Sequence, residues 1–344
     1  MANIALCYDA DYTLLRDYHP RLIFEKRNLD FDNFLNRVRE LEAKEKTKGE
    51  NTRLDIVYLA QFMYEVRHGS LQGLTIQEIR DAGKDLDKML YPGLPEFFNN
   101  IKETNPQHNI SHHIISVGLK DLLEASILGK YADSIFGYTF FDNLTPSSVI
   151  DEIKSTTSAV EKVSSLVTIS KGNDENLFKW PLAHMRYFDD GQTGIPAFSF
   201  LRGRHGECFA VYDPEKPNAF EKTKESLVKY VDHIIPADFR EDSELFRILN
   251  ESLQGTQERI IRKKCWPDLF KRMKRGHKTA EVRLADFDAE PGDIFIAQEW
   301  DPETKRYTGE EIKYRIRNAT KVDFKQFHTL DEIINNEHWI LDLS

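Results

Sequence analysis

Short apolar runs alternate with helical stretches through most of residues 1–255, and this alternation limits the possible folds more than any other feature. The runs expected to be strands are residues 5–8, 109–116, 135–140, 185–188, 208–212 and 233–235. Helical spacing of apolar residues is found between them, at 119–128 and 159–169. Strands that alternate with helices predict an α/β domain with a mainly parallel sheet.

The first apolar run ends in two carboxylates, Asp9 and Asp11, and the hydroxyl of Thr13 follows two residues later. A carboxylate can attack phosphorus and so divide one difficult displacement into two easier ones. A second carboxylate can protonate the leaving oxygen and later activate water, and a bound Mg²⁺ would screen the like charges. An Asp-rich turn that caps a helix has the same composition, so the other strand ends must decide between the two interpretations.

Polar residues follow two other predicted strands in the same way. Ser116 comes at the end of 109–116, and Asp190 follows 185–188. Ligands of open α/β sheets bind at the carboxyl ends of the strands. Asp9, Ser116 and Asp190 are therefore expected at one edge of the sheet, which favours a functional site. Ser116 taken alone could instead cap the helix expected from Leu119.

Length, charge and cysteine content narrow the class of protein. A chain of 344 residues is long enough for two domains or for one domain with an insertion. The net charge of −10 argues against bulk attraction to nucleic acid or to anionic membranes. Three widely spaced cysteines fit a reducing cytoplasm better than a disulfide framework. Neither a leader segment nor an apolar run of membrane-spanning length is evident, so we expect a cytoplasmic protein with no membrane partner.

Two further segments have their own character. Residues 24–103 are charged and helically periodic, with a capping box from Thr75 to Glu78, and predict an all-helical insertion at 21–103. From about residue 256 the chain becomes basic, with nine basic and two acidic residues in 260–283. Strand-like runs at 294–297 and 312–316 flank a hairpin tip at 301–306. We expect a small β-barrel domain at 256–344, with a basic helix leading into it.

Four segments together resemble the motifs of the haloacid dehalogenase-like phosphatases, over about residues 1–255. They are Asp9-x-Asp11-x-Thr13, Ser116 after its apolar run, a lysine near Lys162, and Asp190 within Tyr-Phe-Asp-Asp-Gly-Gln-Thr. The helical insertion stands where this family has its first, C1-type cap. The resemblance implies a Rossmann-like core at 1–20 and 104–255, with the cap at 21–103.

The resemblance implies roles for the first motif. Asp9 would be the nucleophile and a Mg²⁺ ligand, and Thr13 would hold a phosphoryl oxygen. Asp11 would be the general acid and base and would bind the metal through its backbone carbonyl. Its presence favours phosphoryl chemistry over dehalogenation, because a displacement at carbon needs no such acid.

The second and third motifs would complete the phosphate site. Ser116 would bind phosphoryl oxygens together with the backbone N–H groups of Val117 and Gly118. Lys162 would stabilise the nucleophile and the developing charge. Lys171 is the alternative for this role. In relatives, however, the Ile-Ser-Lys-Gly segment that contains it here (169–172) lies beyond the catalytic lysine.

Asp190 would complete the metal site, and here the chain departs from the usual pattern. Asp189 stands where relatives usually have glycine, and Gly194 stands where they have a second aspartate. Paired aspartates are themselves a form of this motif, so Asp189 would supply the missing charge and join the metal ligands. The alternatives are that both aspartates are turn residues before Gly191, or that the domain has lost its activity.

The last domain resembles a small ASCH/PUA-like β-barrel family over about residues 260–344. The resemblance is carried by the pattern Gly276-x-Lys278-x-x-Glu281-x-Arg283. Such folds are associated with RNA or modified nucleotides, and Lys278 and Arg283 on one strand would hold phosphate. Some relatives hydrolyse an amide on a modified cytidine, which would make Lys278, Thr279 and Glu281 catalysts. A structural ladder of ion pairs is the third interpretation.

Together these motifs predict a Mg²⁺-dependent phosphomonoester hydrolase that acts through an aspartyl-phosphate at Asp9. Its substrate would be a phosphorylated small molecule, a nucleotide or an RNA terminal phosphate. One rival is an RNA-binding protein whose phosphatase-like domain is degenerate. Another is an amidohydrolase that uses the last domain.

Overall fold

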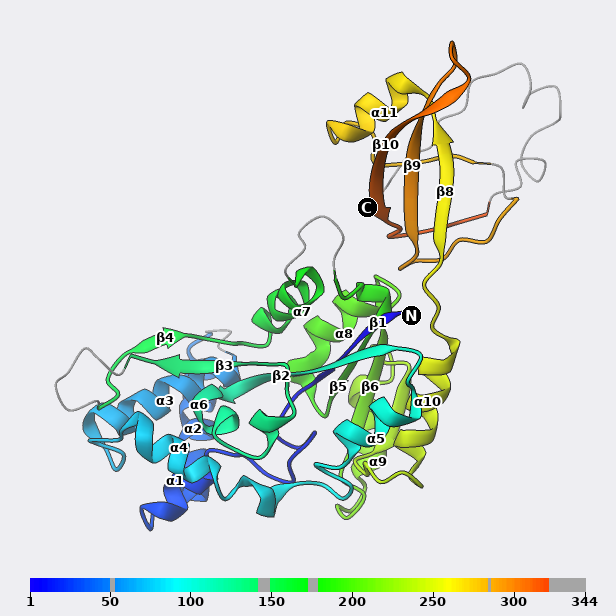
Figure 1. The fold of residues 1–344 in the computed structure, drawn as a ribbon. Helices are drawn as coiled ribbons and strands as arrows, with labels where there is room; N and C mark the ends of the chain where they lie inside the picture. Colours follow the sequence, from blue (N-terminus) through cyan, green and yellow to red (C-terminus); the bar gives the residue numbers. More distant parts are fainter. Residues whose placement is uncertain (50–52, 142–148, 173–178, 284–285, 322–344) are drawn as a thin grey trace. The chain divides into compact units, whose positions relative to one another are not determined.

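The computed structural model describes residues 1–49, 53–141, 149–172, 179–283 and 286–321. These residues fall into two compact units, Met1–Thr256, which we call unit 1, and unit 2, which begins at Gln257 (Figure 1). Within the described ranges, no helix combines the length and the apolar character needed to cross a bilayer.

Unit 1 is built on a sheet that has seven strands among the described residues, in the order β4-β3-β2-β1-β5-β6-β7. The strands are β1 (Asn3–Tyr8), β2 (Asn109–Leu119), β3 (Ser134–Phe140), β4 (Ile153–Ser155), β5 (Met185–Asp189), β6 (Glu207–Tyr212) and β7 (His233–Pro236). Neighbouring strands pair in parallel, except that β4 is antiparallel to β3. The predicted α/β fold with a mainly parallel sheet is confirmed, and β4 is a strand that the sequence did not indicate.

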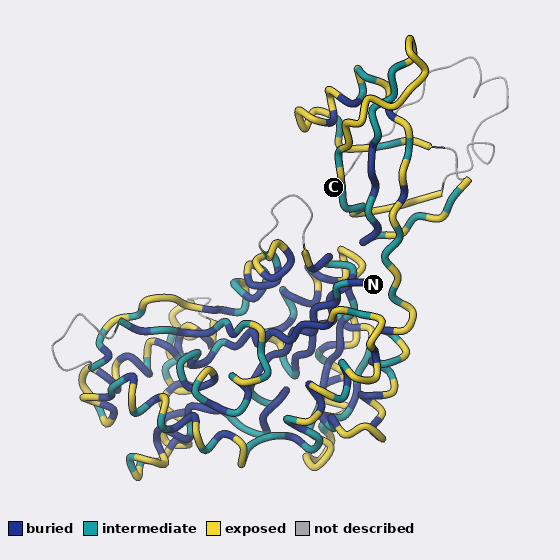
Figure 2. Tube along the Cα trace, viewed as in Figure 1, coloured by how far each residue is buried: buried dark blue, intermediate teal, exposed yellow. Residues whose placement is uncertain are grey.

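The central strand β1 is buried on both faces. Leu6 and Tyr8 belong to one apolar core, whereas Ala5 and Cys7 belong to the core on the opposite face. Parallel strands covered on both sides read as continuous apolar runs, which is why 5–8 shows no polar alternation. Figure 2 shows the strands of this sheet as the most buried part of unit 1.

Helices cover both faces of the sheet. The core that contains Leu6 and Tyr8 also contains side chains from α5 (Phe97–Thr104) and α10 (Glu244–Gly255). The opposite core includes side chains from α7 (Glu161–Lys171), α8 (Ile195–Arg202) and α9 (Ala219–Leu227). Because all described strands but β4 run parallel, their carboxyl ends lie at one edge of the sheet, which these helices leave between the two covered faces.

The segment between β1 and β2 is helical, as predicted. It contains α1 (Arg21–Lys26), α2 (Phe31–Thr47), α3 (Leu54–His68) and α4 (Ile76–Gly83), followed by the short η1 (Leu86–Met89) and α5. The capping box predicted from Thr75 to Glu78 begins α4. The helix α5 differs from the others because Phe97 and Phe98 pack edge-on against Tyr8 of β1, at centroid distances of 6.3 and 5.9 Å.

The predicted helix at 119–128 is wrong in its extent. The strand β2 continues through Ser116 to Leu119, and α6 covers only Lys120–Glu124 before the 3₁₀ turn Leu128–Lys130. Leu119 pairs with Tyr138 of β3, and its N–H donates to the ring of His19. These contacts hold the backbone extended, so tertiary structure overrides the local helical pattern.

Unit 2 is a small sheet with its own core. Its described strands are β8 (Ile260–Cys265), β9 (Ile294–Asp301) and β10 (Arg306–Arg315), in the order β10-β9-β8, with α11 (Pro267–Lys274) packed against them. The predicted hairpin between β9 and β10 is confirmed. The expected basic helix is α11, which carries Lys271, Arg272 and Lys274. The basic residues 262–264 before it lie in β8, whose Ile261 and Cys265 belong to the core. The predicted barrel domain was given the bounds 256–344, and its residues 322–344 lie outside the described residues.

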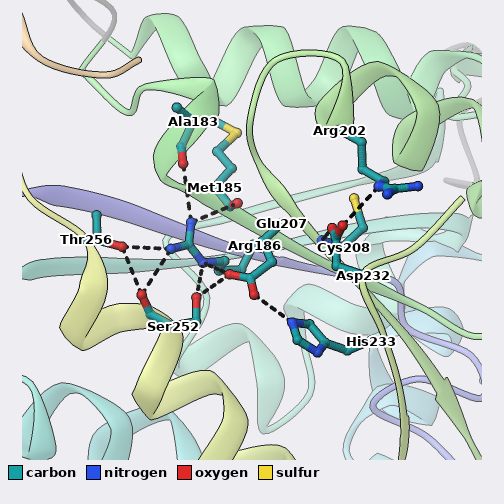
Figure 3. Close-up of polar contacts among 10 residues, drawn as sticks. All are labelled: Ala183, Met185, Arg186, Arg202, Glu207, Cys208, Asp232, His233, Ser252 and Thr256. Carbon is teal, nitrogen blue, oxygen red and sulfur yellow. Dashed lines mark hydrogen bonds and ion pairs between the residues drawn. The ribbon is translucent and has the colours of Figure 1, made fainter. Parts of the chain in front are cut away.

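A buried polar network ties α10 to the amino ends of β5, β6 and β7 (Figure 3). The guanidinium of Arg186 donates to the hydroxyls of Ser252 (2.6 Å) and Thr256 (2.7 Å). Its Nε lies 2.8 Å from a carboxylate oxygen of Glu207, whose other oxygen lies 2.7 Å from Nε2 of His233. The network lies at the opposite end of β5 from Asp189, and it fixes the last helix before unit 2 begins.

Candidate active site

Asp9 lies where the strand order of the sheet reverses. The chain runs outward from β1 through β2 and β3 on one side, and through β5, β6 and β7 on the other. The N–H of Asp9 donates to the carbonyl of Phe188 at 2.8 Å, which ties the end of β1 to the end of β5. Crevices at such reversals are where ligands bind in open α/β sheets.

A group of carboxylates meets at this edge. One oxygen from each of Asp9, Asp189 and Asp190 lies within 4.8 Å of the other two, with Asp9 and Asp189 buried and Asp190 partly exposed. The Asp11 carboxylate lies outside this group and is instead hydrogen-bonded to His19. Closely spaced carboxylate oxygens are the donors that Mg²⁺ takes in proteins.

Lys162 lies between two of these carboxylates. It is the first-turn lysine of α7, its side chain is 0% exposed, and its Nζ lies 2.9 Å from Asp9 and 2.6 Å from Asp189. Burial alone would lower the pKa of Lys162, but Asp189 and Asp9 outweigh burial and raise it, so the ammonium stays charged. Lys171 is exposed at the other end of α7. The geometry therefore favours Lys162 over Lys171.

The group carries more negative charge than Lys162 balances. Burial raises the pKa of Asp9; Lys162 opposes this effect, and the charge of Asp189 adds to it. Burial, followed by Asp189 and Asp9, also raises the pKa of Asp190. A divalent cation among these oxygens would offset the repulsion, so the residues present fit a Mg²⁺ site.

The space beside Gly194 shows how the residues at 189 and 194 fit together. A Cβ at position 194 would lie 2.5 Å from Cγ and 2.7 Å from Oδ2 of Asp189. The Asp189 carboxylate therefore fills the space into which a side chain at 194 would project. It is held there by the hydroxyl of Tyr187 (2.6 Å) and the N–H of Gly191 (3.0 Å).

Ser116 and Thr13 are both buried, and Ser116 lies in β2 two residues beyond Ile114, the last residue of β2 that pairs with β1. Ser116 Oγ accepts the N–H of Gly118 at 3.0 Å, within the extension of β2. It does not cap α6, because that helix begins at Lys120 with Leu119 at its N-cap. Thr13 is 0% exposed, and its Oγ1 has no hydrogen-bond partner among the described residues. Val117 is partly exposed and Gly118 is buried.

His19 and Tyr187 also belong to this site, although the sequence pattern did not indicate either. The ring of His19 contacts the Asp11 carboxylate and accepts the N–H of Leu119, a residue far away in the chain. Tyr187 donates to Asp189 from within a buried strand. No local pattern marks such residues, because their partners are fixed only when distant segments pack together.

In unit 2 the predicted Lys278, Glu281 and Arg283 set is joined by ion pairs. Lys278 and Arg283 both contact the Glu281 carboxylate, Arg283 at 2.8 Å, and Arg283 also donates to the carbonyl of Lys264 at 2.7 Å. The prediction that these residues share one strand is wrong, because 277–283 forms neither helix nor strand. Thr279 is exposed.

Aromatic side chains lie near Lys264 in the same unit. Its Nζ is 4.9 Å from the ring centroid of Trp300 and 5.7 Å from that of Trp266. Trp300 of β9 and Tyr307 of β10 pack edge-on at 5.0 Å. Trp266 and Tyr307 are about half exposed, at 49% and 52%. This surface offers aromatic rings beside basic groups.

Comparison with sequences finds one family model, described as "Domain of unknown function (DUF3850)", which matches residues 262–331. An uncharacterized protein of Borreliella burgdorferi is 23% identical over 245 residues, which cover 63% of this chain and 85% of that protein. The family match lies within unit 2, and neither finding names a function.

Solved structures similar to the chain include phosphatases. A phosphoserine phosphatase with a phospho-aspartyl intermediate analogue is 17% identical, covers 73% of this chain and 99% of its own, and has a TM-score of 0.46. Cytosolic 5′-nucleotidase IIIB bound to cytidine is 12% identical, covers 73% and 86%, and has a TM-score of 0.46. A phosphoserine phosphohydrolase-like protein of Francisella tularensis is 14% identical, covers 74% and 100%, and also scores 0.46. Likenesses of this size do not establish what the chain does.

Proposed function

We propose that unit 1 is a Mg²⁺-dependent phosphomonoester hydrolase in which Asp9 forms an aspartyl-phosphate. The observation that carries this proposal is the position of Asp9, at the reversal of the strand order and within 2.9 Å of the buried Lys162 ammonium. Phosphoryl transfer needs positioning and charge stabilisation more than other chemistry. A buried carboxylate beside a fixed cation and further carboxylates supplies both.

The residues divide the work of the reaction. Asp9, Asp189 and Asp190 would hold Mg²⁺, which when bound screens the charge of the incoming phosphate. Lys162 fixes the attacking carboxylate. Asp11 donates a proton to the leaving oxygen and later takes one from the attacking water.

The phosphoryl group needs donors of its own. The unpartnered hydroxyl of Thr13 can donate to a phosphoryl oxygen without losing another hydrogen bond. Ser116, with the backbone of β2 that follows it, supplies the second contact. The helical insertion would cover the bound substrate and exclude water.

The proposed substrate class is a phosphorylated small molecule or a nucleotide. The support for a nucleotide comes from unit 2, where exposed aromatic rings accompany Lys264. A panel of sugar phosphates, amino acid phosphates, nucleoside monophosphates and RNA with a terminal phosphate separates these classes.

The test measures phosphate release from this panel and from an aryl phosphate, with Mg²⁺ and with a chelator. We expect the wild type to be active with Mg²⁺ and the Asp9→Asn variant to lose at least about 1,000-fold, because it has no nucleophile. The matched control is Lys171→Met, which changes an exposed residue of α7 and should keep full activity. Wild type and Asp9→Asn that are equally inactive across the panel would refute the proposal.

We infer a second activity for unit 2, the binding of RNA or of nucleotides, from its basic and aromatic surface. Bases stack on exposed aromatic rings while cations hold the phosphates. Affinity for a short RNA should fall with rising salt and should weaken in Lys278→Ala and Arg283→Ala. RNA affinity without any phosphatase turnover would instead favour a degenerate unit 1. Affinity that both substitutions leave unchanged would exclude a role of Lys278 and Arg283 in binding.

A further inference from the structure

His19 is bonded twice to the predicted acid and base, Asp11. Its backbone N–H lies 2.8 Å from Oδ1 of Asp11, and its ring Nδ1 lies 2.6 Å from the same oxygen. The His19 side chain is 0% exposed, and that of Asp11 is 13% exposed. No hydrogen bond among the described residues engages Oδ2 of Asp11, so one oxygen is held while the other is left for substrate or water.

The other side of the ring contacts the end of β2. The N–H of Leu119 donates to Nε2 of His19 at 2.8 Å. The ring also lies so close to Gly118 that a Cβ there would be 2.0 Å from Cε1 of His19. Glycine at 118 is therefore required by the close approach of the imidazole.

These two contacts fix which nitrogen of His19 carries a proton. Nε2 accepts the Leu119 N–H, so it presents a lone pair. The proton is therefore on Nδ1, which donates to Asp11. The backbone of Leu119 thus sets the tautomer that lets His19 hold the carboxylate.

We propose that His19 is a positioning residue for general acid catalysis, an inference that rests on the proposed phosphatase function. By holding Oδ1, it aims Oδ2 of Asp11 at the leaving oxygen. It also connects Asp11 to the backbone beside Ser116, so the acid and the phosphate-binding segment keep a fixed spacing. Among the described residues, the side chain of His19 hydrogen-bonds only Asp11 and the backbone of Leu119, and neither the metal group nor the phosphate donors Thr13 and Ser116.

Substrates with different leaving groups test this role. An alkoxide needs a proton to leave, whereas nitrophenolate leaves without one, so only the alkyl phosphate depends on a well-aimed acid. We would measure kcat/KM for nitrophenyl phosphate and for the best alkyl phosphate of the panel. This parameter reports the first phosphoryl transfer, in which the leaving group departs.

Two substitutions separate the two contacts of the ring. The amide nitrogen of His19→Asn can stand in for Nδ1 and keep the bond to Asp11. The amide oxygen of His19→Gln can stand in for Nε2, so that of the two bonds of the ring only the one from Leu119 is kept, while the backbone N–H still bonds Asp11. We expect His19→Gln to lose about 100-fold on the alkyl phosphate and less than about 10-fold on the aryl phosphate, while His19→Asn keeps a ratio close to that of the wild type.

Two further variants distinguish a misplaced His19 ring from a general loss of stability. Gly118→Ala keeps the His19 side chain but displaces its ring; because the Gly118 N–H also bonds Ser116, both substrates should lose activity, and the alkyl phosphate should lose more. The control is His112→Gln, which removes a buried histidine that bonds the hydroxyl of Tyr8 and the carbonyl of Phe98. It should lower the thermal midpoint without changing the ratio between the two substrates.

The outcomes are distinct. Equal losses on both substrates in His19→Gln, His19→Asn and Gly118→Ala would mean that His19 only packs, and would overturn this inference alone. A wild type that is inert toward every phosphate would overturn the proposed function and this inference with it.

Discussion

At the scale of single residues, Lys162 is the side chain whose charge the site most depends on. It is fully buried and contacts Asp9 and Asp189. We expect Lys162→Met to abolish phosphate release and to lower the free energy of unfolding by about 3–5 kcal/mol, because two buried carboxylates lose their cation. Denaturant unfolding without added metal measures this loss. Lys171→Met is the control and should change neither quantity; a variant of Lys162 as stable and active as the wild type would contradict the assignment.

The pair of Asp189 and Gly194 gives a second prediction at this scale. Asp189→Gly should lower the affinity for Mg²⁺ and the activity, because it removes one of the grouped carboxylates. Gly194→Asp alone should destabilise the protein, since its Cβ would lie 2.5 Å from Asp189 Cγ.

The double variant should recover part of both losses, because the new carboxylate would project into the space that Asp189 vacates. Titration of activity with Mg²⁺ and the thermal midpoint measure the two effects. If the double variant is no better than the worse of the two single variants, an aspartate at 194 does not compensate for the loss of Asp189.

At the scale of elements, the network of Arg186, Glu207 and His233 makes stability depend on pH. Burial raises the pKa of Glu207, but the hydrogen bond from His233 and the charge of Arg186 outweigh it, so the pKa lies below its ordinary value of 4.5. A lowered carboxylate pKa contributes stability that is present above the unfolded pKa and is lost as the pH falls through the folded one.

We therefore expect Glu207→Gln to be less stable than the wild type at neutral pH by about 1–3 kcal/mol. The difference should begin to shrink as the pH falls below 4.5, where the unfolded chain takes up a proton, and should shrink until the pH is below the lowered pKa of the folded carboxyl. Urea unfolding at a series of pH values measures this difference. A gap that stays constant down to acidic pH would mean that the Glu207 charge does not stabilise α10 against the sheet.

The helices and strands predicted from the sequence are correct where a run of residues is buried throughout. They are wrong where a contact with a distant segment determines the backbone conformation. The apolar runs before Asp9 and at 185–188 are strands because both faces of the sheet are covered. The helix expected from Leu119 was too long, because pairing with Tyr138 extends β2. The basic helix expected in unit 2 is α11, and the basic residues 262–264 before it lie in β8, whose Ile261 and Cys265 belong to the core.

At the scale of the whole molecule, each unit has an apolar core of its own. A chain that ends at Gln257 keeps Thr256, whose hydroxyl bonds Arg186, and it keeps every residue of the proposed active site. We expect this shortened chain to fold and to hydrolyse the aryl phosphate within about 3-fold of the full chain, because domains with their own cores fold independently.

Circular dichroism and phosphate release test this expectation. A chain that ends at Gly255 is the matched control, since it lacks the Thr256 hydroxyl and should have a lower thermal midpoint. A folded but inactive chain ending at Gln257 would show that unit 2 contributes to hydrolysis.

By itself, the sequence determined the fold class, the helical insertion, and that Asp9 and Asp190 follow strands of one sheet. These features depend on local periodicity and on the rule that parallel strands end at one edge. Only the tertiary structure decided that Lys162 and not Lys171 reaches Asp9, that Asp189 fills the space beside Gly194, and that His19 joins Asp11 to Leu119. Those contacts join segments far apart in the chain, and their geometry exists only once the helices and strands have packed.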